Sequence, residues 1–147
     1  MPYITKFIYG LTASLRLVEV DATKYPVKDE DSELPIPFVW RATICAIVSA
    51  FVRNDYELWA GVKDVDPIPS NEAEGIRGYI EEYGAELIDL PEDTWQSSVC
   101  IWMRNYWVAI VDLWTAKEGC SDLVLHLHIY EAADGGYRFS VHAVYVP

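Results

Sequence analysis

The sequence predicts an α+β fold in which two main helices pack on one face of a curved antiparallel β-sheet. Two segments with apolar residues at helical spacing occupy the middle of the chain, at residues 38–53 and about 72–83. Four segments with the alternation of β-strands follow them. These segments are residues 98–104, 107–114, 122–130 and 137–146. Because the turns between them are short, we expect an antiparallel meander.

Length and composition predict a single domain over residues 1–147. Of the 147 residues, 52% are hydrophobic and 14% aromatic, which is enough apolar material for one core without a staple. We expect N-terminal strands with an acidic, Pro-containing loop in 1–36, a helical part in 37–97 and the β-meander in 98–147. Alternation on either side of Gly10 predicts that the N-terminal strands join the sheet.

The first helix is predicted to begin after Pro37, whose fixed φ suits a first helical turn. Its apolar residues form two stripes, which predicts a central helix covered on nearly all sides. One stripe is Trp40, Ile44, Ile47 and Phe51, and the other is Phe38, Ala42, Cys45 and Val52.

The second helix is predicted to begin at an Asn71 N-cap, with Glu74 completing a capping box, and to end at Gly84. Residues 54–70 before it predict a loop that could contain one short strand at 56–60. Leu90-Pro91 predicts a further Pro-started helical turn at 90–95.

Within the sheet, one segment indicates which side faces the helices. Leu123, Leu125, Leu127 and Ile129 alternate with more polar residues, so the leucine face is expected to meet the helices. Residues 107–114 are apolar on both sides apart from Asp112, which predicts a central strand.

Charge is the strongest global signal. Eleven Lys and Arg face 23 Asp and Glu, a net charge of −12. Such a surface repels nucleic acid, because phosphate binding needs cations, and it favours a basic partner. Twelve of the acidic residues lie between Asp55 and Asp93, where only Lys63 and Arg77 oppose them.

This acidic segment is predicted to bind a basic protein, because complementary potential raises association rate and specificity. The alternative is a solvated face that only keeps the protein soluble. Aromatic residues among the charges provide binding anchors. The predicted partner-binding residues are Glu72, Glu74, Glu81, Glu82, Glu86, Asp64, Asp66 and Trp59.

All three histidines, His126, His128 and His142, lie in the last two predicted strands. A three-residue turn at 134–136 would place His128 opposite His142 and keep Ala143 on the leucine side, whereas a two-residue turn would reverse this relation. Three imidazoles on one face could bind zinc or another divalent metal. The preferred interpretation is a polar sheet face without a metal.

Asp112 interrupts an apolar strand. A catalytic acid with a raised pKa is one interpretation. The preferred one is structural, with the carboxylate accepting hydrogen bonds from the turn at 119–121.

No catalytic motif is present: the sequence has no GxSxG, phosphate loop, GxGxxG or HExxH. We therefore expect a protein that is not an enzyme and that needs no cofactor. Cys45, Cys100 and Cys120 have no CxxC spacing and predict reduced thiols, the first two buried and the last exposed. No apolar run is long enough to span a membrane and no signal peptide is visible, so we expect a cytoplasmic protein.

The stretch at residues 107–125 has the pattern V-D-L-W-T-x-x-E-G-x-S-D-L-x-L. It resembles the core of a family of small bacterial proteins of unknown function, and Tyr83-Gly84 and Leu90-Pro91 fit the same pattern. The resemblance covers about the second half of the chain and departs at Cys120, where a basic residue is expected. It implies a bacterial or phage origin and a hairpin whose turn is organised by Asp112, Ser121 and Asp122, but no activity.

Size and charge favour an inhibitor that occludes a basic partner, most simply an immunity protein that neutralises a bacterial toxin. A phage anti-defence protein whose carboxylates imitate DNA phosphates is a second hypothesis. A third is a cone-shaped α+β domain that binds a small ligand or carries an active site, with a pocket near Trp102, Trp107, Trp114, His126 and His128.

Overall fold

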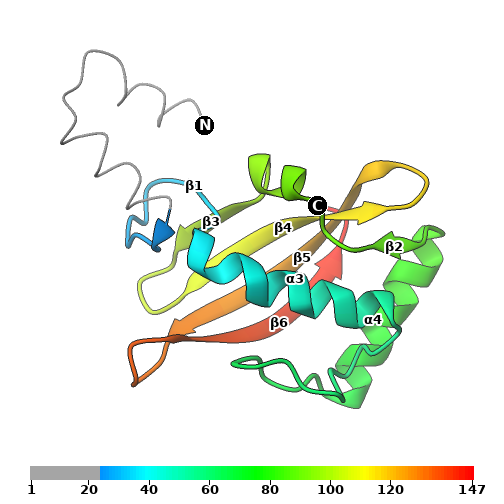
Figure 1. Cartoon of the computed structure of the whole chain (residues 1–147), viewed down its shortest axis with the longest axis horizontal. Coiled ribbons are helices and arrows are strands. Elements are labelled where there is room, and N and C mark those ends of the chain that lie inside the picture. Colours follow the sequence, from blue (N-terminus) through cyan, green and yellow to red (C-terminus); the bar gives the residue numbers. More distant parts are fainter. Residues whose placement is uncertain (1–23) are drawn as a thin grey trace, which may run out of the picture.

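The computed structural model describes residues 24–147 and has the expected α+β architecture (Figure 1). Its six-stranded antiparallel sheet has the order β1-β3-β4-β5-β6, with β2 pairing β4 beyond β3. The strands are β1 (Leu34–Pro35), β2 (Leu87–Ile88), β3 (Val99–Trp102), β4 (Trp107–Thr115), β5 (Gly119–Glu131) and β6 (Tyr137–Tyr145). The strands predicted within 3–20 lie outside the described residues.

Helix α3 (Phe38–Val52) lies across one face of the sheet (Figure 1). Trp40, Ile44 and Ile47 are fully buried against that face, because the helical period turns them all to the same side. The expected covering of both stripes is wrong. Phe38, in the other stripe, is 63% exposed, so α3 is covered by the sheet on one side only among the described residues.

Helix α4 (Ser70–Tyr83) begins one to two residues earlier than predicted, after Pro69. The expected capping box is absent, since no side chain caps the first turn. The Ser70 hydroxyl instead donates to Glu57 Oε1 at 2.5 Å. The predicted end is confirmed: Gly84 adopts φ 82°, a left-handed conformation that glycine reaches without a Cβ clash.

The inner face of the sheet carries the core. Leu123, Leu125, Leu127 and Ile129 on β5 are all fully buried, as the alternation predicts. β4 lies between β3 and β5, which confirms a central strand. Trp40 makes edge-on contacts with the Trp107 ring at 5.4 Å and the Tyr137 ring at 5.7 Å. These contacts fix α3 on the sheet.

Residues 53–69 form a loop of turns, and the short strand expected at 56–60 is absent from it. The Asp55 carboxylate accepts hydrogen bonds from the backbone N–H of Trp59 at 2.8 Å and of Ala60 at 3.1 Å. Leu58 has φ 56° and is buried within the loop. The loop is thus held by its own side chains.

The helical turn expected at 90–95 is a 3₁₀-helix, η1 (Glu92–Gln96). Among the described residues, no helix is both long and apolar enough to cross a membrane.

Candidate functional site

Helix α4 carries four of the carboxylates that were predicted to bind a partner. Ala73, Ile76 and Ile80 form its buried side. Because these residues recur at three- and four-residue spacing, the residues between them point to solvent. The exposed carboxylates of the helix are Glu72, Glu74, Glu81 and Glu82.

Few of the predicted partner-binding carboxylates are neutralised. Glu81 has Arg77 at 4.0 Å, and Asp66 has Arg138 at 3.5 Å. The other five form no ion pair and no side-chain hydrogen bond within residues 24–147. They are Glu72, Glu74, Glu82, Glu86 and Asp64. The negative potential over α4 and the neighbouring loops is therefore left largely uncompensated.

Trp59 is the most exposed large apolar side chain described, at 88%. Its backbone is anchored by the Asp55 carboxylate, and Tyr56 and Leu58, which precede it in the loop, are buried. Tyr56 stacks on Phe51 of α3, with ring centroids 5.4 Å apart. A fixed turn thus holds a large indole in solvent, next to the acidic segment.

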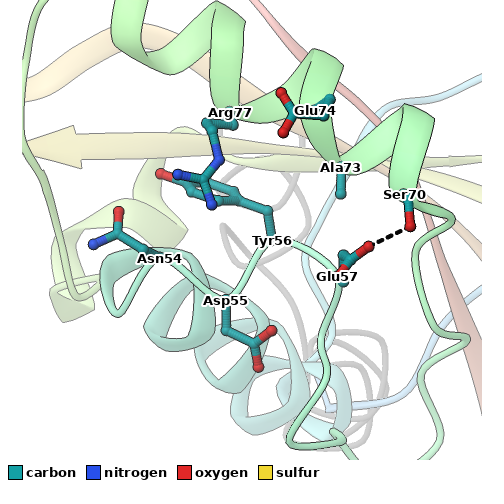
Figure 2. A pocket seen from close by; sticks show the side chains of 8 residues that line it. All are labelled: Asn54, Asp55, Tyr56, Glu57, Ser70, Ala73, Glu74 and Arg77. Carbon is teal, nitrogen blue, oxygen red and sulfur yellow. Dashed lines mark hydrogen bonds between the residues drawn. The ribbon is translucent and has the colours of Figure 1, made fainter.

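A hollow of about 170 Å³ lies between this loop and the beginning of α4 (Figure 2). Arg77 lies over the Tyr56 ring with its guanidinium carbon 5.1 Å from the ring centroid. Glu57, Glu74 and Asp55 line the hollow together with Arg77. Burial raises the pKa of the Tyr56 hydroxyl. The hollow can hold a side chain that carries hydrogen-bond donors, such as an arginine or lysine of a partner.

Asp112, Ser121 and Asp122 were expected to organise the β4–β5 turn, and the structure gives each a different role. Ser121 is structural: its hydroxyl donates to the Leu113 carbonyl at 2.7 Å and accepts from the Leu123 N–H at 3.1 Å. Asp122 contributes only its backbone N–H, which donates to the Tyr83 hydroxyl at 3.3 Å.

The expected partner of Asp112 is wrong. Its carboxylate accepts a hydrogen bond from Ser97, and not from the turn at 119–121. Its backbone N–H donates to Ser98 and its carbonyl accepts from Thr94. Asp112 therefore ties β4 to η1 and to the segment that follows it. The sequence could not indicate this partner, because it lies fifteen residues away, just before the neighbouring strand β3.

His126, His128 and His142 lie together on the outer face of the sheet, away from α3. One nitrogen from each ring lies within 4.8 Å of the others. The rings of His128 and His142 stack at 4.5 Å, and the rings of His126 and His142 are 4.6 Å apart.

The strand register that brings the histidines together differs from the expected one. His128 faces Ser140, and a β-bulge opposite His126 inserts one extra residue into β6, so that Leu127 pairs Val141 and His126 pairs Ala143. His142 is the extra residue and stays on the outer face, whereas Val144, not Ala143, points to the core. A signal was present in the sequence, since Val141 and Val144 are three apart instead of two.

Tyr145 is a neighbour of this cluster that the sequence did not indicate. Its hydroxyl lies 3.1 Å from His126 Nδ1. The other nitrogen of His126, Nε2, is buried and has no hydrogen-bond partner among the described residues. Burial and the neighbouring His142 and His128 lower the pKa of His126 to about 4.

The pocket suggested for a small ligand is not formed by the residues named for it. Trp107 packs on the inner face and Trp102 contacts it there, with ring centroids 4.5 Å apart. Trp114, His126 and His128 alternate with buried residues and lie on the outer face. The two groups are on opposite sides of one sheet and cannot line one cavity.

The thiols match their expected environments in part. Cys100 is buried and Cys120 is exposed, but Cys45 is only partly buried.

Residues 48–147 match the model of one protein family, described as Domain of unknown function (DUF7668). The match includes the whole segment of the proposed signature and begins within α3. No curated protein and no solved structure matches the chain.

Proposed function

The chain belongs to the DUF7668 family, a domain of unknown function, and we propose that it is a non-enzymatic binding protein that inhibits a basic protein partner. The observation that carries the proposal is the set of four exposed carboxylates on α4, of which Glu72, Glu74 and Glu82 make no ion pair within residues 24–147. A surface with uncompensated negative charge attracts a positively charged one, so these carboxylates favour a basic partner.

Two further features support a protein surface as the partner. Trp59 supplies a large apolar anchor on a loop that its neighbours hold in place, which limits the ordering cost of binding. The hollow beside α4 is lined by three carboxylates and one cation, Arg77, so the net charge of its lining favours a cationic side chain. An aromatic anchor beside negative potential is a combination that suits a basic protein.

More specifically, we propose that the chain is an immunity protein, which occludes a toxin in the cytoplasm by stoichiometric binding. No chemistry by the chain is required, because coverage of the toxin surface alone prevents substrate access. Imitation of DNA phosphates by the same carboxylates is the competing form, and the experiment below separates the two.

The test is quantitative capture of binding proteins from cells of the producing organism by the full chain and three variants. One variant carries Glu72→Lys, Glu74→Lys and Glu82→Lys, and the second carries Trp59→Ala. The matched control carries Asp31→Lys, Glu33→Lys and Asp134→Lys, which changes net charge equally at exposed sites outside residues 55–93.

We expect one basic protein to be retained by the wild type and the matched control and lost from the other two variants. The purified protein should then lose its activity at a one-to-one ratio with the wild type. Equal losses from the α4 variant and the matched control would contradict the proposal. A captured protein that binds DNA, and that DNA releases from the chain, would assign the DNA-mimic form instead.

A further inference from the structure

We propose that His126, His128 and His142 bind one divalent transition-metal ion, such as Zn²⁺, on the outer face of the sheet. The three imidazoles converge from two neighbouring strands, with one nitrogen of each within 4.8 Å of the others. The site is independent of the acidic α4 surface, which lies on the side chains of a different element.

The β-bulge in β6 adds Tyr145 to the histidine cluster. Without it, β6 would continue its alternation, and Tyr145 would share the inner side with Phe139 and Val141. The extra residue at His142 turns Tyr145 to the outer face, beside His126. Bulges are typical of positions where a strand re-aims a functional side chain.

The hydrogen bonds of His126 favour metal binding through Nε2. A metal-bound histidine donates its other ring N–H to an oxygen, which fixes the tautomer and the ring orientation. When Nδ1–H of His126 donates to the Tyr145 hydroxyl, the lone pair of Nε2 remains available. Nε2 is buried without any hydrogen-bond partner among residues 24–147, an arrangement that costs free energy unless a ligand fills it.

The spacing of the three histidine nitrogens requires only a small adjustment to bind one zinc ion. A tetrahedral zinc ion with Zn–N bonds of about 2.0–2.1 Å separates its ligand atoms by about 3.3 Å. The three nitrogens lie within 4.8 Å of one another, and the His128 and His142 rings stack at an interplanar angle of 17°. His142 is exposed, so its ring can turn its edge toward the other two without disturbing the core.

The ligand set indicates the class of metal. Three imidazoles without a carboxylate suit Zn²⁺, Cu²⁺ or Ni²⁺ and not Mg²⁺ or Ca²⁺, which need oxygen ligands. Three protein ligands leave a fourth position for water, as in open zinc sites. Because His142 is exposed, that position faces solvent.

The test is titration of the metal-free full chain with Zn²⁺ followed by calorimetry, and with Co²⁺ followed by its visible absorption. We expect one ion per chain and the Co²⁺ spectrum of a four-coordinate nitrogen site. His126→Gln and His142→Gln should each weaken binding by more than the roughly 10–100-fold expected for loss of an outer hydrogen bond, as in Tyr145→Phe.

Two controls keep the result specific. Ser140→Ala changes a residue of β6 that pairs His128 but offers no ring nitrogen, and Cys120→Ser removes the exposed thiol. Both should bind Zn²⁺ as the wild type does, and circular dichroism should confirm the fold of every variant. Binding only at millimolar Zn²⁺, or equal binding by the wild type and folded His126→Gln, would overturn the proposal, as would loss of binding in Cys120→Ser.

Discussion

Cys100 shows at the residue scale how burial controls the chemistry of a side chain. It lies on the inner face of β3, 3% exposed, with its thiol against the Pro35 carbonyl at 3.5 Å. Burial raises the pKa of the Cys100 thiol to about 12. A thiolate in this apolar setting would be poorly solvated, so Cys100 is a packing residue and not a nucleophile.

This pKa predicts a dependence of stability on pH. In the unfolded chain Cys100 releases its proton near its ordinary pKa of 9.0, whereas the folded chain keeps it until about pH 12. The folded state then binds more protons than the unfolded state, so the free energy of unfolding falls as pH rises above 9. At pH 10 the loss from this one thiol should be about 1 kcal/mol relative to pH 7.5.

Urea unfolding of the wild type and Cys100→Ala at the two pH values, in reducing buffer, measures this effect. The wild type should lose about 1 kcal/mol more than the variant between pH 7.5 and pH 10. Other groups titrate equally in both proteins and cancel in the comparison. An identical loss in the two proteins would show that the thiol ionises normally in the fold.

At the element scale, the sequence indicated which segments are helices and strands better than it indicated their ends and registers. α3, β4 and η1 lie where their apolar periods and prolines predict them. The start of α4 differed because Ser70, a possible cap, uses its hydroxyl to bind Glu57 in the preceding loop. Local patterns cannot show such a tertiary competitor.

The histidine cluster also shows that local patterns predict the strands but not the register between them. Period-two alternation placed His126 and His128 on one face, and that placement agrees with the structure. The pairing with β6 depended on the turn after Glu131 and on the bulge at His142, so the exact neighbours could not be derived from either strand alone. Tyr145 became part of the cluster only through that bulge.

α4 also yields a stability prediction. Gly75 and Gly78 lie on its exposed side, and a Cβ at either position would meet no atom within 4 Å. Since glycine costs a helix interior about 0.5–1 kcal/mol relative to alanine, Gly78→Ala should raise the free energy of unfolding by that amount.

Gly84→Ala is the matched comparison, because the same methyl group is added at a position with φ 82°. There alanine is strained, and the free energy of unfolding should fall. Chemical unfolding of both variants gives the two signs. Destabilisation by Gly78→Ala would mean that the exposed side of α4 is covered in solution.

At the scale of the whole molecule, the fold carries two surfaces with different chemistry. The exposed carboxylates and Trp59 lie on α4 and the loop at 53–69, whereas the histidines lie on the outer face of the sheet. The inner face of the sheet and α3 form the core. The charge asymmetry was visible in the sequence, as was the absence of catalytic motifs. Tertiary contacts, such as that of Arg138 with Asp66, determine which carboxylates have a basic neighbour. Only the structure could supply these contacts.

The central claim is that uncompensated negative potential on α4 guides a basic partner to the chain. The most direct measurement is the association rate constant of the wild type with the captured partner, as a function of salt concentration. Electrostatic guidance predicts that this rate constant falls about 10-fold or more between low salt and about 0.5 M salt, since ions screen charges over about 10 Å or less. The variant with Glu72→Lys, Glu74→Lys and Glu82→Lys should associate slowly at every salt concentration. A wild-type rate constant that does not change with salt would contradict the claim.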